Sequence, residues 1–93
     1  MPEERPYWVY ILRCGDGTLY TGSTRDVGRR LALHRSGRGA KYTRGRGPLQ
    51  VVYREACAGK SQALRREAAI KALTRREKEA LVAAQASRCA DLD

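Results

Sequence analysis

The sequence predicts a small α+β domain with three strands and three helices in the order β-β-α-β-α-α. Two strand patterns, Tyr7 to Leu12 and Thr18 to Thr21, flank the turn-forming residues Gly15-Asp16-Gly17, which indicates a hairpin. A third strand pattern spans Gln50 to Ala56, and stretches with helical spacing follow the hairpin and this third strand. Three strands are too few for a doubly wound parallel sheet, so the α+β class is favoured.

The length of the hairpin turn decides whether two tyrosines meet. Side chains alternate between the faces of a strand, so a shift of one residue turns a whole strand over. A three-residue turn places Leu12 opposite Tyr20 and brings both phenols to one face. It also places Tyr10 opposite Gly22. A two-residue turn would point the phenols to opposite faces, and we expect the three-residue turn.

Capping signals predict where the helices begin. The first helix runs from Val27 to Ser36 after a cap in Thr24-Arg25-Asp26. The second runs from about Gln62 to Leu73 and can be capped by Ser61.

The third helix follows a capping box, Thr74-Arg75-Arg76-Glu77, and is expected to end near Ala84. We expect one domain over residues 1–93, with its core at about 7–84 and a loosely ordered tail at 85–93.

The composition indicates a cytoplasmic protein with reduced thiols. The cysteines, Cys14, Cys57 and Cys89, are odd in number and widely spaced, which fits neither a disulfide framework nor a zinc knuckle. The first five residues contain no apolar signal core, and no apolar run approaches the ~18 residues that span a bilayer. We therefore expect no membrane partner.

Charge is the strongest compositional signal. The 93 residues include 19 Lys and Arg against 10 Asp and Glu, a formal net charge of +9, and most of the basic residues are arginine. Such an excess indicates a polyanion partner, nucleic acid first. Arginine binds phosphate through two parallel hydrogen bonds, which strengthens this expectation.

Residues 36–48 are too rich in glycine to form a regular element, and basic residues are spaced along them. The basic side chains could bind phosphates and Tyr42 could stack on a base. A flexible, solvated connector is the alternative. The basic candidates in this loop are Arg38, Lys41, Arg44 and Arg46.

Polar residues fall on the predicted inward faces of two helices. At ~100° per residue, Arg30 and His34 lie on the same arc as the apolar Val27 and Leu31. Glu67 likewise lies between two apolar positions of the second helix. A carboxylate there needs a cation, a donor or a metal. The structural alternative is an ion pair between Arg30 and Glu67.

Together these residues suggest a site that cleaves phosphodiesters. Such a site needs a proton acceptor, a cation for the phosphate and a carboxylate for a metal. We expect the site residues from the hairpin and both helices to meet on one sheet face that the helices cover. They are Tyr10, Tyr20, Arg30, His34 and Glu67.

The order of these motifs resembles the GIY-YIG nuclease superfamily, and most closely its small single-domain bacterial members. The resemblance rests on Trp8-Val9-Tyr10, Tyr20-Thr21-Gly22, Arg30-x-x-x-His34 and Glu67 within Leu64-Arg65-Arg66-Glu67. The segments Gly39 to Arg44 and Ile70 to Thr74 also resemble that subgroup. The first motif keeps only its tyrosine, and Lys71 lies where other branches often have an amide side chain.

The resemblance implies a three-stranded antiparallel sheet flanked by helices and a single Mg²⁺ or Mn²⁺. Glu67 would be the metal ligand, which suits Mg²⁺ because this ion keeps most of its water shell. Arg30 would hold the scissile phosphate. Tyr10, assisted by Tyr20, would position or deprotonate the attacking water. His34 would orient the site or relay a proton.

The sequence therefore favours a metal-dependent endonuclease acting on duplex or branched DNA, in repair or recombination. A small domain has little area for reading sequence, so we expect preference for DNA shape or junctions, or targeting by a protein partner. The alternatives are a non-catalytic nucleic-acid-binding module on the same scaffold and a structural adaptor that binds a protein through the third helix. In either DNA-binding case, Lys71 joins the loop residues as a candidate contact.

Overall fold

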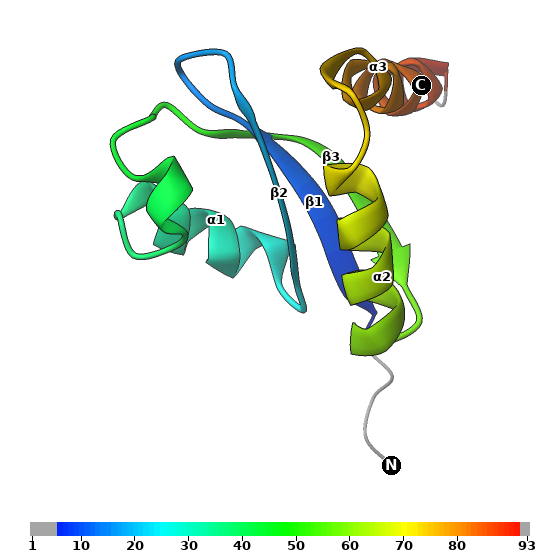
Figure 1. The fold of residues 1–93 in the computed structure, drawn as a ribbon, viewed down its shortest axis with the longest axis horizontal. Coiled ribbons are helices and arrows are strands. Elements are labelled where there is room, and N and C mark those ends of the chain that lie inside the picture. The colour runs from blue at the N-terminus through cyan, green and yellow to red at the C-terminus, as the bar shows by residue number, and fades with distance from the viewer. Residues whose placement is uncertain (1–5, 92–93) are drawn as a thin grey trace.

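The computed structural model of the protein describes the backbone of residues 6–91 and the side chains of residues 6–87. The elements are β1 (Tyr7–Arg13), β2 (Leu19–Thr24), α1 (Val27–Arg35), the 3₁₀ turn η1 (Lys41–Thr43), β3 (Gln50–Cys57), α2 (Lys60–Lys71) and α3 (Arg75–Asp91). The strands form one antiparallel sheet in the order β2-β1-β3 (Figure 1). The predicted class and element order are confirmed.

The β1–β2 hairpin has the three-residue turn expected from the sequence. Leu12 pairs with Tyr20 and Tyr10 pairs with Gly22. The backbone N–H of Cys14 donates to the carbonyl of Thr18 across the turn, at 2.9 Å. Both phenols consequently lie on one face of the sheet, with ring centroids 6.4 Å apart.

The sheet lies between two helical layers, and each face has its own core. On one face, α1 packs Val27 against Tyr10 and Leu12. On the other face, α2 and α3 cover Val9 and Ile11 (Figure 1). The expectation that α1 and α2 share one sheet face is therefore wrong. Helical spacing identifies the inward side of each helix, but the path of the chain decides which face of the sheet that side covers.

The helix starts follow the sequence signals in two of three cases. Asp26 caps α1 by accepting from the N–H of Arg29 at 3.0 Å. The capping box of α3 is formed: Glu77 accepts from the Thr74 N–H at 2.9 Å and donates its own N–H to Thr74 Oγ1 at 3.1 Å. The Ser61 cap is wrong, because α2 begins at Lys60, one residue earlier.

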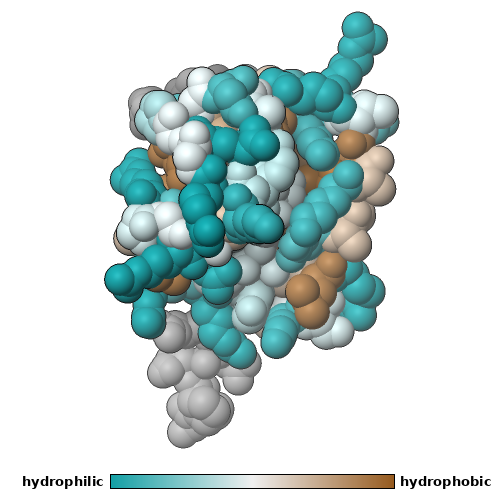
Figure 2. Space-filling view, turned by 60° about the vertical axis from the view of Figure 1, so that its left-hand side comes forward, coloured by the Kyte–Doolittle hydropathy of each residue, from teal (hydrophilic) through white to brown (hydrophobic). Residues whose placement is uncertain are grey.

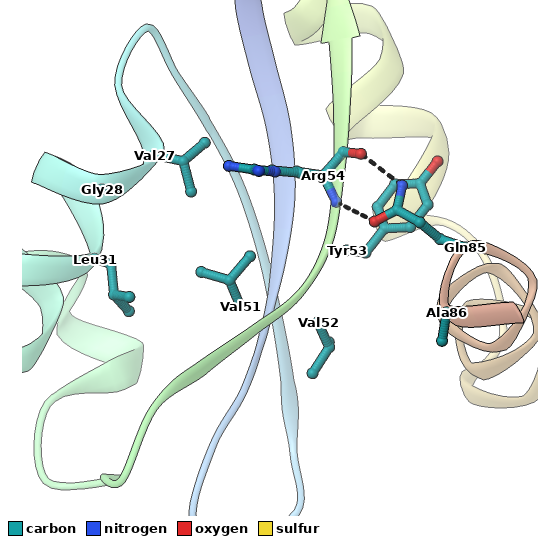
Figure 3. A pocket seen from close by; sticks show the side chains of 9 residues that line it. All are labelled: Val27, Gly28, Leu31, Val51, Val52, Tyr53, Arg54, Gln85 and Ala86. Atoms are coloured by element: carbon teal, nitrogen blue, oxygen red, sulfur yellow. Dashed lines mark hydrogen bonds between the residues drawn. The ribbon is translucent and has the colours of Figure 1, made fainter. Parts of the chain in front are cut away.

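Helix α3 continues to Asp91, past the end expected near Ala84. The sequence pattern is weak there, but Gln85 is anchored to the sheet. Its side-chain amide accepts from the Arg54 N–H at 3.0 Å and donates to the Arg54 carbonyl at 2.7 Å (Figure 3). Gln85 thus covers part of the outer edge of β3, where unpaired backbone groups invite strand pairing with another chain. An apolar groove of about 410 Å³ lies beside it, between α1 and α3.

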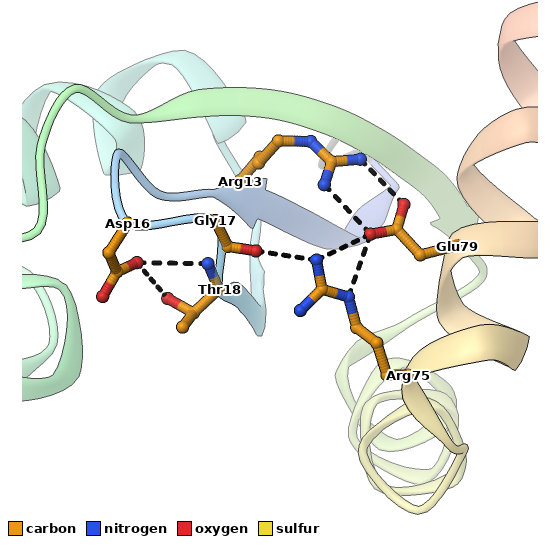
Figure 4. A network of polar contacts seen from close by, with 6 residues as sticks. All are labelled: Arg13, Asp16, Gly17, Thr18, Arg75 and Glu79. Atoms are coloured by element: carbon orange, nitrogen blue, oxygen red, sulfur yellow. Dashed lines mark hydrogen bonds and ion pairs between the residues drawn. The ribbon is translucent and has the colours of Figure 1, made fainter.

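A polar cluster ties the start of α3 to the hairpin. Both terminal nitrogens of Arg13 donate to Glu79, at 3.0 and 2.8 Å. Arg75 also donates to Glu79 at 2.9 Å and to the carbonyl of Gly17 at 2.8 Å. Figure 4 shows this carboxylate between the two guanidinium groups. This cluster of Arg13, Arg75 and Glu79, the clamp, fixes α3 against the strands.

The surface is strongly hydrophilic on the face shown in Figure 2, where small hydrophobic patches interrupt the charged side chains. Within residues 6–91, no helix has the length and apolar character needed to cross a bilayer. Cys14 and Cys57 are buried and free. The side chain of Cys89 lies outside the described residues.

Candidate active site

The phenol of Tyr10 packs over Gly22 of the edge strand β2, on the sheet face that α1 covers. Tyr10 is only 1% exposed. A Cβ atom built on Gly22 would lie 2.6 Å from Tyr10 Oη, so only glycine leaves room for the ring at this position. Sequence reasoning missed this role. The available signal was the glycine that follows Tyr20-Thr21 directly opposite Tyr10.

His34 receives the hydroxyl of Tyr10 in a buried hydrogen bond. Tyr10 Oη lies 2.9 Å from His34 Nε2, and Thr43 Oγ1 lies 2.9 Å from His34 Nδ1. His34 and Thr43 are each 2% exposed. Gly39 packs against the imidazole so closely that a Cβ there would overlap Nδ1 of His34. The loop after α1 therefore holds the imidazole, and sequence reasoning did not single out Thr43.

The Thr43 hydroxyl favours a specific tautomer of His34. Thr43 Oγ1 donates to the carbonyl of Ala40 at 3.0 Å, which leaves its lone pairs for an Nδ1–H of His34. Nε2 then accepts the Tyr10 proton. A longer contact of 3.3 Å from the Ala40 N–H to Nδ1 favours the other tautomer. The two arrangements differ in the position of one imidazole proton, and the shorter contacts favour the chain Tyr10 to His34 to Thr43.

Arg30 supplies positive charge beside both aromatic groups. Burial raises the pKa of Tyr10 well above its usual range, the nearby Tyr20 raises it further, and the charge of Arg30 opposes this shift. Burial lowers the pKa of His34, and the charge of Arg30 lowers it further. At neutral pH the pair is therefore a protonated phenol and a neutral imidazole.

Glu67 reaches the same strand edge from the opposite face of the sheet. Ser23 Oγ of β2 donates to Glu67 Oε1 at 2.7 Å, and Lys71 Nζ lies 2.7 Å from Glu67 Oε2. The side chain of Glu67 is 16% exposed, and its charge contributes to the raised pKa of Tyr10. The site thus lies around the outer edge of β2, with contributions from both faces.

The ion pair between Arg30 and Glu67, which was the structural alternative to a catalytic role, does not form among the described residues. Glu67 pairs with Lys71, and none of the ion pairs among the described side chains includes Arg30. Arg30 lies near the edge of β2 that Glu67 reaches, but it has no acidic partner among the described side chains. Its guanidinium is therefore available to bind an anion. Phosphate is such an anion.

The single carboxylate of Glu67 fits a metal ion that needs few protein ligands. No cluster of three or more His, Cys, Asp or Glu side chains that could hold a metal occurs in the part of the chain that is described. Glu67 offers one carboxylate, and Mg²⁺ accepts such a site because it retains several waters. The Lys71 ammonium now contacts Oε2, so a cation at that oxygen would compete with it.

A family model described as the GIY-YIG catalytic domain matches residues 6–80. The chain belongs to the GIY-YIG family. It is 55% identical over 76 residues to the UPF0213 protein BH0048 of Halalkalibacterium halodurans, across 82% of this chain and 81% of that protein. It is 54% identical over 77 residues to a UPF0213 protein of Natronomonas pharaonis, across 83% and 91% of the two chains.

Two solved structures are similar to this GIY-YIG domain. The solution NMR structure of UPF0213 protein BH0048 from Bacillus halodurans superposes with a TM-score of 0.54 at 55% identity, covering 83% of this chain and 82% of that one. The solution NMR structure of protein EF2693 from E. faecalis superposes with a TM-score of 0.58 at 38% identity, covering 100% and 94%. Both likenesses support the three-stranded fold.

The aromatic cluster of the GIY-YIG domain extends from Tyr10 to the surface. Tyr20 lies 5.2 Å from His34 between ring centroids and stacks on Tyr42 at 5.8 Å. The Arg46 guanidinium lies over the Tyr42 ring at 4.4 Å. Tyr42, 42% exposed, thus already has two partners, and a base stacking on it would compete with them.

The basic loop is packed against the domain and differs from a free connector. Arg46 pairs with Asp16 of the hairpin turn and donates to the Tyr42 carbonyl at 2.6 Å. This makes Arg46 a structural link rather than an open phosphate contact. The other loop candidates, Arg38, Lys41 and Arg44, are exposed, as is Lys71.

Proposed function

We propose that this GIY-YIG domain is an endonuclease that hydrolyses DNA phosphodiesters with one Mg²⁺ or Mn²⁺ held by Glu67. One observation carries the proposal: the hydrogen-bonded chain from Tyr10 through His34 to Thr43 begins at the phenol of Tyr10, on which the charges of Arg30 and Glu67 both act. A proton path, a free guanidinium and a carboxylate are the groups that water attack on a phosphodiester requires.

The raised pKa of Tyr10 shapes the mechanism. A resting phenolate is disfavoured, so Tyr10 would not act as a base by itself. Tyr10 Oη would accept the proton of the attacking water while its own proton passes to His34 Nε2. Thr43 would hold the imidazole so that Nε2 faces the phenol. Tyr20 would pack beside this pair and limit its movement.

Arg30 would bind the scissile phosphate and offset the charge that builds up on its oxygens in the transition state. Glu67, oriented by Ser23, would hold the metal through its carboxylate. A bound divalent ion supplies further positive charge and lowers the pKa of a coordinated water. Lys71 would move from Glu67 to a phosphate oxygen when the metal binds.

The direct test is cleavage of single-stranded, duplex, flap and four-way-junction DNA in Mg²⁺ and in Mn²⁺. Glu67→Gln should abolish cutting and leave binding measurable. Glu55→Gln is the matched control: Glu55 lies on β3 and pairs with Arg66, away from the β2 edge. Cutting by Glu67→Gln at the rate of the control would remove Glu67 from the mechanism.

The same panel addresses the finer expectations. Preference for flaps or junctions over duplex would support a structure-directed enzyme acting in DNA repair or recombination. We further propose that it acts in the cytoplasm and that a protein partner supplies targeting. Cleavage at one short defined sequence would contradict that preference.

A non-catalytic nucleic-acid-binding module is the second candidate. It is favoured by the ion pair of Lys71 with Glu67, which places an ammonium where a metal would bind, and by the exposed Arg38, Lys41 and Arg44. This function predicts salt-sensitive binding without cutting at any protein excess, in either metal.

A further inference from the structure

The outer edge of β2 has a basic hollow at each end. β2 is an edge strand, because the sheet order is β2-β1-β3. It runs from Leu19 to Thr24, a length of about 17 Å at ~3.4 Å per residue. Gly22 and Ser23, which contact Tyr10 and Glu67, lie between the hollows.

The first hollow lies where β2 leads into α1 and has a volume of about 370 Å³. Its lining residues are Thr24, Arg25, Asp26, Arg29, Arg30 and Leu33. Three of them are arginines, and the Asp26 carboxylate is engaged in capping α1. Among the described side chains, no ion pair involves Arg25 or Arg29, and Arg25 only lies over the Tyr7 ring.

The second hollow lies at the start of β2 and also has a volume of about 370 Å³. It is lined by Leu19, Tyr20, Thr21, Tyr42, Lys71 and Lys78. Lys71 and Lys78 come from two different helices, α2 and α3. Thr21 is 3% exposed, and its hydroxyl has no hydrogen-bond partner among the described residues. Lys78 forms no ion pair within that set either.

We infer that one DNA strand lies along the outer edge of β2, with phosphates on the two sides of the cleaved bond held by the two hollows. Arg25 and Arg29 would hold the phosphates on one side, and Lys78 and Lys71 those on the other. The ~17 Å edge is several times longer than the ~3.4 Å axial rise of one nucleotide in B-DNA, so it can contact phosphates on both sides of one bond. The position of the cleaved bond rests on the proposed function, whereas the contacts themselves do not.

Salt dependence of binding tests these contacts without cleavage. The probes are a 12-base-pair duplex and a single strand of the same sequence, titrated in EDTA at several salt concentrations and followed by fluorescence anisotropy. Arg25→Ala/Arg29→Ala should reduce the slope of log Kd against log salt by roughly 2, and Lys78→Ala should reduce it by roughly 1. If the slope falls with the duplex probe, duplex DNA lies along β2; if it falls with the single-strand probe, single-stranded DNA does.

Matched controls separate local contacts from net charge. Lys60→Ala/Arg65→Ala removes two positive charges from exposed α2 residues that line neither hollow, and Lys60→Ala removes one. Circular dichroism and thermal melting confirm folding of every variant. The inference would be overturned if Arg25→Ala/Arg29→Ala and Lys78→Ala, the hollow variants, gave the same slope of log Kd against log salt as their controls.

Cleavage assays on the same variants keep the two proposals distinguishable. If wild type does not cut but the hollow variants lose slope, the DNA path stands and the nuclease proposal fails. If wild type cuts and the hollow variants match their controls in slope, the nuclease proposal stands and the path fails. A loss of slope in one hollow alone also overturns the inference, because the proposed strand spans both.

Discussion

The phenol of Tyr10 occupies the space that a side chain on Gly22 would need. A Cβ atom on Gly22 would lie 2.6 Å from Tyr10 Oη and 2.8 Å from Cζ. This close approach lets the hydroxyl bond His34 on the α1 face, and the charge of Glu67, from the α2 side of the sheet, contributes to the raised pKa of Tyr10. Gly22 thereby leaves the space that the Tyr10 phenol occupies when it bonds His34.

Gly22→Ala should therefore displace the phenol and separate Tyr10 from His34. We expect cleavage to fall by about 10²-fold, because a displacement of ~1 Å in a catalytic group has such an effect. Overpacking should also lower the free energy of unfolding by about 1–3 kcal/mol. Cleavage rates and urea unfolding measure the two effects.

Gly28→Ala is the matched control for that substitution. Gly28 is exposed on α1, and the nearest atom to a new Cβ is Asp26 Oδ1 at 3.6 Å. Alanine in a helix is more stable than glycine by roughly 0.5–1 kcal/mol, so this variant should gain stability and keep its activity. Equal activity in the two variants would show that the placement of Tyr10 is not required.

Thr43 should act as a positioning residue for His34. Thr43→Val keeps the shape of the side chain but removes the hydroxyl bonded to Nδ1, so the imidazole loses its preference for the Nδ1–H tautomer. We expect a rate loss of up to about 10²-fold, the lower end of what a proton-transfer partner contributes. ¹⁵N chemical shifts of the His34 ring should change in parallel.

Thr43→Ser restores the hydroxyl and should recover the wild-type tautomer and most of the rate. This comparison separates a hydrogen-bonding role from a packing role. Wild-type ¹⁵N shifts and a wild-type rate in Thr43→Val would contradict the positioning role.

The lowered pKa of His34 predicts the acid side of the pH profile. Cleavage needs the neutral imidazole, so activity should be lost as the pH falls through a value below the ordinary ~6.5 of histidine. The raised pKa of Tyr10 predicts no second transition from phenolate formation between pH 7 and 10. An NMR titration of the His34 ring measures the same transition without turnover.

The lowered pKa of His34 also predicts that the free energy of unfolding decreases as the pH falls. A histidine whose folded pKa is depressed is protonated more readily in the unfolded chain, so its contribution is present above pH ~6.5 and is lost as the pH falls. Arg30→Gln removes the second cause of the depression and should move the His34 titration toward its ordinary value. A titration that moves in the opposite direction would contradict the assigned role of Arg30.

Local features of the fold could be predicted from the sequence because they depend on neighbouring residues. The turn length fixed the pairing of Tyr10 with Gly22, and Thr74 with Glu77 identified the start of α3. The helical spacing also identified Arg30 and His34 as residues on the inward side of α1.

Features that depend on tertiary packing could not be predicted. Spacing along a helix does not say which sheet face it covers, so the opposite positions of α1 and α2 were missed. The bond from Thr43 to His34 and the link from Arg46 to Asp16 depend on the path of an irregular loop. Single-sequence patterns contain no information about that path.

The clamp at Glu79 predicts a specific change of stability with acid. Hydrogen bonds from Arg13 and then Arg75 lower the pKa of Glu79 to about 2 from an ordinary value of 4.5. A carboxyl group with a depressed folded pKa stabilises the fold above its unfolded pKa, and this contribution is lost as the pH falls from about 4.5 to 2. Because the side chain is 35% exposed, solvent screening limits the contribution to about 1 kcal/mol or less.

Glu79→Gln should consequently lower the Tm at pH 7 by up to about 4–8 °C, and the difference from wild type should shrink toward zero near pH 2. Asp16, whose pKa is also lowered to about 2, titrates in both proteins and cancels from the comparison. Glu77→Gln is the control, since glutamine can still accept from the Thr74 N–H in the capping box. A Tm difference for Glu79→Gln that stays constant between pH 7 and pH 2 would show that the charge of Glu79 does not hold α3 against β1.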